Sequence, residues 1–223
     1  MRHVSVTLGA CLALSACTEN ESTFPLGDQT LCVPTRYLAE VPSWIEAIPG
    51  LDRTREQLWV LIPAEEVVAE IPTYAPDTHV IRGSRRFREL SVLIGSARDI
   101  QGLSAAQTRL LEVTAEPDME YVSEAGTELL RVHHYEKYPI WSLVRWRRDA
   151  GEAYPRERLY AWIAAYCSQY SFDEMQNCTA QRLYKGLTYQ FPLPGLNLSN
   201  IDKLQTFIET RISGWLEACN KQT

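Results

Sequence analysis

Histidines and nucleophile motifs are the features of this 223-residue chain that could support catalysis at neutral pH. His133 and His134 are adjacent, and a strand over residues 128–135 would point them to opposite faces, so the pair could not bind one metal ion without a bulge. The sequence contains no Gly-x-Ser-x-Gly elbow, His-Glu-x-x-His pair or phosphate-binding glycine loop. We therefore predict no catalytic residue, no metal and no cofactor.

A cysteine near the N-terminus is placed for covalent modification by lipid. A basic start at residues 1–3 precedes an apolar run at residues 4–14, which is too short to span a bilayer but is typical of a secretory signal. Leu14-Ser15-Ala16-Cys17 follows and resembles the lipobox of bacterial lipoproteins. In that family the cysteine thiol receives diacylglycerol and the signal is cut just before the cysteine. The resemblance implies a lipid anchor at Cys17.

The same resemblance implies a location. Acyl chains hold a protein on a membrane, and the absence of aspartate after Cys17 points to the outer membrane, facing the periplasm. We expect a signal peptide at 1–16, a lipid-anchored tether at 17–30 and a single β-rich periplasmic domain at 31–223. Two alternatives remain: the shorter Leu8-Gly9-Ala10-Cys11 pattern, and an ordinary secreted protein cleaved after Ala16.

Four further cysteines could form two disulfides in an oxidising compartment. They are Cys32, Cys167, Cys178 and Cys219, and four cysteines allow three pairings. We favour Cys167 with Cys178, which closes a polar loop, and Cys32 with Cys219, which joins the first ordered segment to the last helix. A zinc site is disfavoured because the chain has no Cys-x-x-Cys and no histidine near these four residues.

The composition is that of a globular protein, with 45% hydrophobic and 22% charged residues. The formal net charge of −6 disfavours nucleic acid as a partner, because neutralising phosphates requires a basic face.

Two groups of arginines interrupt this acidic chain, one around Gly83 and one around Trp146. Guanidinium groups match carboxylates and phosphates, and arginine and aromatic side chains anchor many interfaces. The alternative is that the arginines pair with carboxylates of the same chain. The candidate binding residues are Arg85, Arg86, Arg88, Arg145, Trp146 and Arg147.

Short runs rich in β-branched, aromatic and leucine residues recur roughly every ten residues, which favours antiparallel strands. Trp141 and Trp146 differ in parity, so at least one of them should reach the surface unless both faces are covered. Strands are predicted at residues 58–62, 67–71, 79–81, 90–94, 110–114, 120–123, 128–135, 140–146, 159–167 and 187–193.

One amphipathic helix is predicted at the C-terminal end. Ser199 and Asp202 resemble a capping arrangement, and one apolar stripe runs from Ile201 to Leu216 before the helix ends near Cys219. Shorter helices are possible at residues 104–110 and 42–44. The predicted fold class is α+β, mainly antiparallel sheet (sandwich-like), with this helix lying on the sheet.

Several of these features together resemble periplasmic immunity lipoproteins, which protect bacteria against lipase effectors delivered by type VI secretion. The features are Cys32-Val33-Pro34, Tyr37, Cys167 and Cys178, Tyr189-x-Phe191, Ile201-Asp202, Trp215 and Cys219. The resemblance implies a toxin as protein partner, a membrane contact through the lipid anchor, and no catalysis. The alternatives are a structural or assembly lipoprotein of the envelope, and a periplasmic hydrolase whose carboxylates or His133 converge only in the fold.

Overall fold

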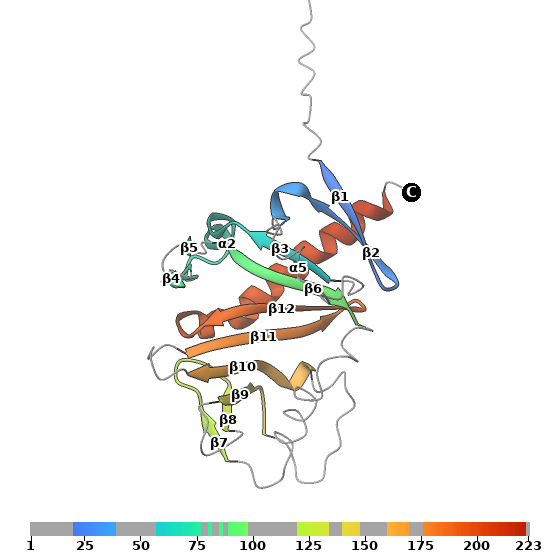
Figure 1. Ribbon diagram of the computed structural model, residues 1–223. Coiled ribbons are helices and arrows are strands. Elements are labelled where there is room, and N and C mark those ends of the chain that lie inside the picture. The colour runs from blue at the N-terminus through green and yellow to red at the C-terminus, as the bar shows by residue number, and fades with distance from the viewer. Residues whose placement is uncertain are drawn as a thin grey trace, which may run out of the picture.

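The computed structural model consists of an antiparallel sheet with a long C-terminal helix across one face (Figure 1). It describes residues 20–38, 57–76, 80–81, 85–86, 89–97, 120–133, 140–147, 160–169 and 176–221. The eight strands of the main sheet, in spatial order, are β3 (Gln57–Ile62), β6 (Leu90–Ser96), β12 (Leu187–Pro194), β11 (Gln176–Tyr184), β10 (Ile163–Gln169), β9 (Ile140–Val144), β8 (Leu130–His133) and β7 (Tyr121–Ser123). All pairings are antiparallel, so the predicted α+β class is confirmed.

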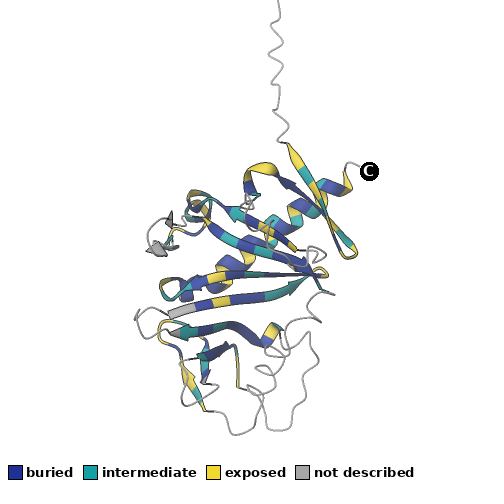
Figure 2. Ribbon diagram, in the orientation of Figure 1, coloured by how far each residue is buried: buried dark blue, intermediate teal, exposed yellow. Residues whose placement is uncertain are grey.

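The main core lies between the sheet and helix α5 (Ile201–Asn220), which follows the 3-10 helix η3 (Gly195–Asn200). Along β12, Tyr189 and Phe191 are fully buried, and α5 contributes Leu204 and Ile212 to the same core. Buried positions run along the central strands and along α5 (Figure 2). Burial, and to a smaller extent the adjacent Glu209 carboxylate, raises the pKa of Tyr189, whose hydroxyl donates to Glu209 at 2.8 Å.

A second, smaller core lies on the opposite face, over β8, β9 and β10. Neighbouring residues of β9 alternate between faces, so Leu143 joins the main core and Val144 joins the smaller one. Trp162 is fully buried there, and its indole Nε1 donates to the carbonyl of Trp146 at 2.7 Å. The far end of the sheet therefore has apolar packing on both faces.

A separate hairpin, β1 (Glu21–Leu26) and β2 (Gln29–Pro34), packs beside the C-terminal end of α5 (Figure 1). Residues 21–30 of the expected tether thus belong to an ordered element. The local sequence of β1 is polar and gives little strand signal. The hairpin is held by tertiary contacts, since Leu31 and Val33 of β2 are fully buried in the main core.

Other elements differ from the sequence expectation in ways that packing explains. Residues 67–71 were predicted as a strand, but α2 (Ala64–Glu70) and its C-cap occupy this segment. The buried residues Ala64, Val67 and Ile71 have helical spacing. Strand β11 was missed because its sequence is mostly polar, although neighbours on both sides complete its pairing. The elements expected at residues 42–44, 104–110 and 110–114 lie outside the described residues.

The remaining described elements are short: the 3-10 helix η1 (Thr35–Tyr37) and the two-stranded sheet β4 (Val80–Ile81) and β5 (Arg85–Arg86). Among the residues that the structure describes, none forms a helix long and apolar enough to cross a membrane.

Candidate protein-binding site

The four downstream cysteines form the two pairs that the sequence favoured. Cys32 of β2 is bonded to Cys219 of α5, and Cys167 of β10 is bonded to Cys178 of β11. The first bond joins segments 187 residues apart, and the second joins directly opposed positions of neighbouring strands. Cys17 lies outside the described residues, so its lipidation stays a prediction.

The two arginine groups are placed in different parts of the fold. Arg85 and Arg86 form β5, which pairs with β4, and Arg88 lies outside the described residues. Arg145, Trp146 and Arg147 follow directly on the end of β9. The structure therefore describes the side chains of the second group only, and these lie at the far end of the sheet.

Arg145 is largely engaged inside the chain. Its Nη2 donates to Asp202 Oδ1 at 2.6 Å and to Gln205 Oε1 at 2.8 Å, and its side chain is 20% exposed. Two buried donors of this contact, Arg145 Nε and Gln205 Nε2, have no hydrogen-bond partner within the described part of the chain. Arg145 thus links β9 to the first turns of α5, as the intramolecular alternative anticipated.

Trp146 and Arg147 lie nearer the surface. The Trp146 side chain is 40% exposed, whereas Trp141 is 2% exposed. One tryptophan is accessible, as expected, but not because of strand parity: β9 ends at Val144, so Trp146 lies beyond the strand. Arg147 donates to the Tyr121 carbonyl at 3.4 Å and lies 5.8 Å from the centre of the Tyr121 ring. This arginine is exposed and is held along strand β7.

A cleft of about 610 Å³ opens next to Arg145, between the β7–β8 turn and the start of α5. This volume is within the range of about 300–1,000 Å³ typical of ligand pockets. Its walls come from three segments that are distant in sequence. The lining residues are Gly126, Thr127, Glu128, Leu129, Arg145, Leu198, Ser199, Ile201 and Asp202.

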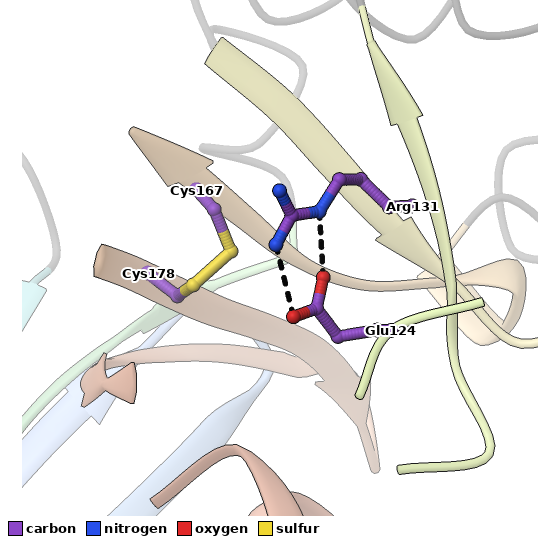
Figure 3. The surroundings of a disulfide bond; sticks show 4 residues. All are labelled: Glu124, Arg131, Cys167 and Cys178. Carbon is purple, nitrogen blue, oxygen red and sulfur yellow. Dashed lines mark hydrogen bonds and ion pairs between the residues drawn. A yellow bond between two sulfur atoms is a disulfide. The ribbon is translucent and has the colours of Figure 1, made fainter. Parts of the chain in front are cut away.

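An ion pair at the base of the β7–β8 turn anchors the wall that this turn forms. Arg131 of β8 donates to both carboxylate oxygens of Glu124, at 2.7 and 2.9 Å, and its guanidinium lies 4.5 Å from the centre of the Trp141 ring. Figure 3 shows this pair beside the Cys167–Cys178 disulfide. Since Glu124 is 6% exposed, the pair fixes the turn through a largely desolvated contact.

The turn itself has local constraints. Thr127 Oγ1 donates to the Glu124 carbonyl and accepts from the Leu129 amide, both at 3.1 Å. Gly126 has a φ of +74°, a backbone conformation that glycine adopts without strain. These contacts give the cleft a defined wall.

The opposite wall is held by two buried asparagines of η3. Asn197 bonds the backbone of Ala75 in both directions, with its Nδ2 donating to the carbonyl at 2.6 Å and its Oδ1 accepting from the amide at 2.8 Å. Asn200 Nδ2 donates to the Thr73 carbonyl at 2.9 Å, and Asn200 Oδ1 accepts from the Thr73 hydroxyl at 2.7 Å. Leu196 lies in the chain between the end of β12 and these two asparagines, and it is 77% exposed.

We expect Asn197→Ala to lower the free energy of unfolding by about 2 kcal/mol, because a fully buried residue loses two hydrogen bonds and Ala75 loses both its partners. Urea unfolding measures the loss, and faster hydrogen exchange at the Ala75 amide locates it. Ser199→Ala, at an exposed position two residues further on, is the control and should leave both measurements nearly unchanged. An unaltered Ala75 exchange rate in Asn197→Ala would contradict this account.

Three exposed apolar side chains belong to the segments that form the cleft. Val122 of β7 is 45% exposed, and Trp146 and Leu196 complete the group, whereas the similarly exposed Trp59 lies on β3 at the other edge of the sheet. We call these three residues the apolar rim: each lies within four residues of one that lines the cleft, although none of them is a lining residue. Exposed apolar side chains are frequent anchors of protein-binding sites. Sequence reasoning found Trp146 but missed Val122 and Leu196, because local sequence gives no signal that either would be exposed.

Metal-ligating and titratable groups of the described residues bear on the sequence predictions about metals and catalysis. They contain no group of three or more His, Cys, Asp or Glu residues that could hold a metal ion. Burial raises the pKa of the Tyr166 phenol above its usual range. The side chains of His79, His133 and His134 are not described, so the alternative that places His133 in a catalytic site is untested.

Comparisons with known proteins show similarity of fold alone. No family model and no curated protein sequence matches the chain. The fold is similar to Smlt3025, an immunity protein of the Stenotrophomonas maltophilia type IV secretion system, with a TM-score of 0.50 and 13% identity over 88% of this chain and 93% of that one. A further match is the iron-regulated outer membrane lipoprotein FrpD of Neisseria meningitidis, with a TM-score of 0.42 and 11% identity over 89% and 93% of the two chains.

Proposed function

We propose that this protein is a lipid-anchored periplasmic immunity protein that binds and neutralises a toxin through the cleft and its apolar rim. The observation that carries the proposal is that three exposed apolar residues, Val122, Trp146 and Leu196, lie within four residues of those that line one cleft. The similarity of fold to an immunity protein supports it.

The finer features of the proposal come from the sequence. The lipobox at Cys17 would hold the domain at the outer membrane, and a lipase-type effector attacks the bilayer beside it. The two disulfides support an oxidising compartment. The sequence resemblance points to type VI secretion, whereas Smlt3025 belongs to a type IV secretion system. Identifying the captured toxin would show which system delivers it.

The proposal is tested by capturing partners of the full-length protein from detergent-solubilised envelopes, and by deleting the gene and exposing the cells to a toxin-delivering sibling strain. We expect a captured toxin with membrane-directed activity, inhibition of that activity by the purified protein, and loss of resistance in the deletion strain. Unchanged resistance together with no inhibited toxin would reject the proposal and favour a structural role in the envelope.

The rim is tested by replacing its exposed apolar residues. We expect Leu196→Glu and Trp146→Glu each to weaken toxin binding by at least about tenfold, because exposed apolar anchors carry much of the energy of an interface. Trp59→Glu is the matched control, since Trp59 is 43% exposed and lies at the other edge of the sheet. Calorimetric titration gives the affinities, and equal losses in all three variants would place the interface elsewhere.

A further inference from the structure

The charges that line the cleft do not balance. Arg145 is neutralised by Asp202 at 2.6 Å, which leaves Glu128 as the additional charge of the lining. Glu128 is exposed and has neither a hydrogen bond nor an ion pair within the described residues. Asp202 is itself 69% exposed, so its carboxylate can receive a second cation. An occupant carrying positive charge is therefore favoured over an acidic one, which would meet both carboxylates.

The cleft is apolar as well as acidic. Leu129, Leu198 and Ile201 line it and are only 3–5% exposed, so they present small apolar surfaces between the polar lining residues. Lysine and arginine side chains combine a long aliphatic stem with a charged head. Such a stem could lie against these residues while its head reaches Glu128.

The contact between Arg145 and Gln205 leaves two hydrogen-bond donors without acceptors among the described residues. Arg145 lines the cleft, and its buried Nε has no acceptor among the described residues, as is also true of Nε2 of Gln205, which is 3% exposed. Both atoms are buried, so an acceptor could reach them only if Arg145 or Gln205 moved, and a bare metal cation would bring none. A peptide segment brings backbone carbonyl groups together with its side chains.

We propose that the cleft receives a lysine or arginine side chain projecting from a surface segment of the toxin, with its aliphatic stem on Leu198 and Ile201 and its charge between Glu128 and Asp202. This inference rests on the proposed function and names the chemistry of the partner at that site. The apolar rim residues, Trp146 and Leu196, would pack against the residues that flank this side chain.

The peptide test examines the cleft without the toxin. The full-length protein in detergent, labelled at its isoleucine and leucine methyl groups, is titrated with acetyl-Gly-Leu-Arg-Leu-Gly-amide and, as control, with the same peptide carrying Glu in place of Arg. We expect millimolar binding of the arginine peptide with shifts at Leu129, Leu198 and Ile201, and at least about fivefold weaker binding of the glutamate peptide. Equal binding of both peptides, or shifts confined to other parts of the protein, would overturn the proposal.

The toxin test uses charge reversal. We expect Glu128→Lys to weaken binding of the captured toxin by at least about tenfold and to reduce its dependence on salt. Glu217→Lys, an exposed reversal near the other end of α5, is the matched control and should leave the affinity unchanged. Equal affinity of the wild type and Glu128→Lys would reject this inference and leave the proposed function standing, whereas a wild type that neutralises no toxin would reject the function itself.

Discussion

Replacing Arg131 with methionine is expected to lower the free energy of unfolding by about 3–5 kcal/mol. Methionine keeps much of the stem that packs beside Trp141 but removes the two hydrogen bonds to Glu124, at 2.7 and 2.9 Å. Because Glu124 is 6% exposed, its carboxylate would be left buried without its charge partner. Urea unfolding monitored by tryptophan fluorescence gives the free energy.

The matched control is Arg147→Met, which removes a nearby arginine that is exposed and donates one long contact of 3.4 Å to the Tyr121 carbonyl. Its effect should be small, since exposed polar contacts contribute little to stability. A second control, Glu124→Leu with Arg131→Met, removes both charges and should recover part of the loss. If Arg131→Met cost no more than Arg147→Met, the ion pair would not anchor the β7–β8 turn.

This ion pair connects stability to the proposed site. Glu124 precedes the turn that carries Gly126, Thr127 and Glu128 into the cleft, and Arg131 follows it. Beside the pair, the Cys167–Cys178 bond joins strands β10 and β11 (Figure 3). The turn is therefore fixed at its base by the ion pair, which holds one wall of the cleft in place before a partner arrives.

The sequence correctly predicted the elements in which buried residues recur at the regular spacing of a strand or of a helix. Leu187, Tyr189, Phe191 and Leu193 alternate along β12 and are all buried. The apolar stripe of α5 likewise predicted the two ends of the helix closely, since the observed helix covers residues 201–220. In both cases the pattern within a single segment carries the information, because one face of the element is covered along its whole length.

The elements and residues that sequence missed depend on distant partners. β11 is polar in sequence but is completed by strands on both sides, and β1 is ordered through its pairing with β2. The cleft likewise combines residues 126–129, Arg145 and the start of α5. Leu196 stays exposed because Asn197 and Asn200 hold its 3-10 helix against residues 73–75, a contact between segments more than 120 residues apart. No local pattern encodes such a contact.

Removing the Cys32–Cys219 bond by changing both residues to alanine is expected to destabilise the protein by about 5 kcal/mol, whereas the same change at Cys167 and Cys178 is expected to cost about 3 kcal/mol. The difference follows from chain entropy, because the first bond spans 187 residues of the unfolded chain and the second spans 11. Urea unfolding of the oxidised wild type and both double variants measures the two losses.

The longer bond should also decide how the hairpin behaves. It joins β2 to the last turn of α5, so without it the β1–β2 hairpin would depend on the packing of Leu26, Leu31 and Val33 in the main core. Hydrogen exchange should then speed up in β1 and β2 of the Cys32/Cys219 variant and stay slow there in the Cys167/Cys178 variant. Equal losses of stability, with unchanged exchange in the hairpin, would show that packing rather than the crosslink holds this segment.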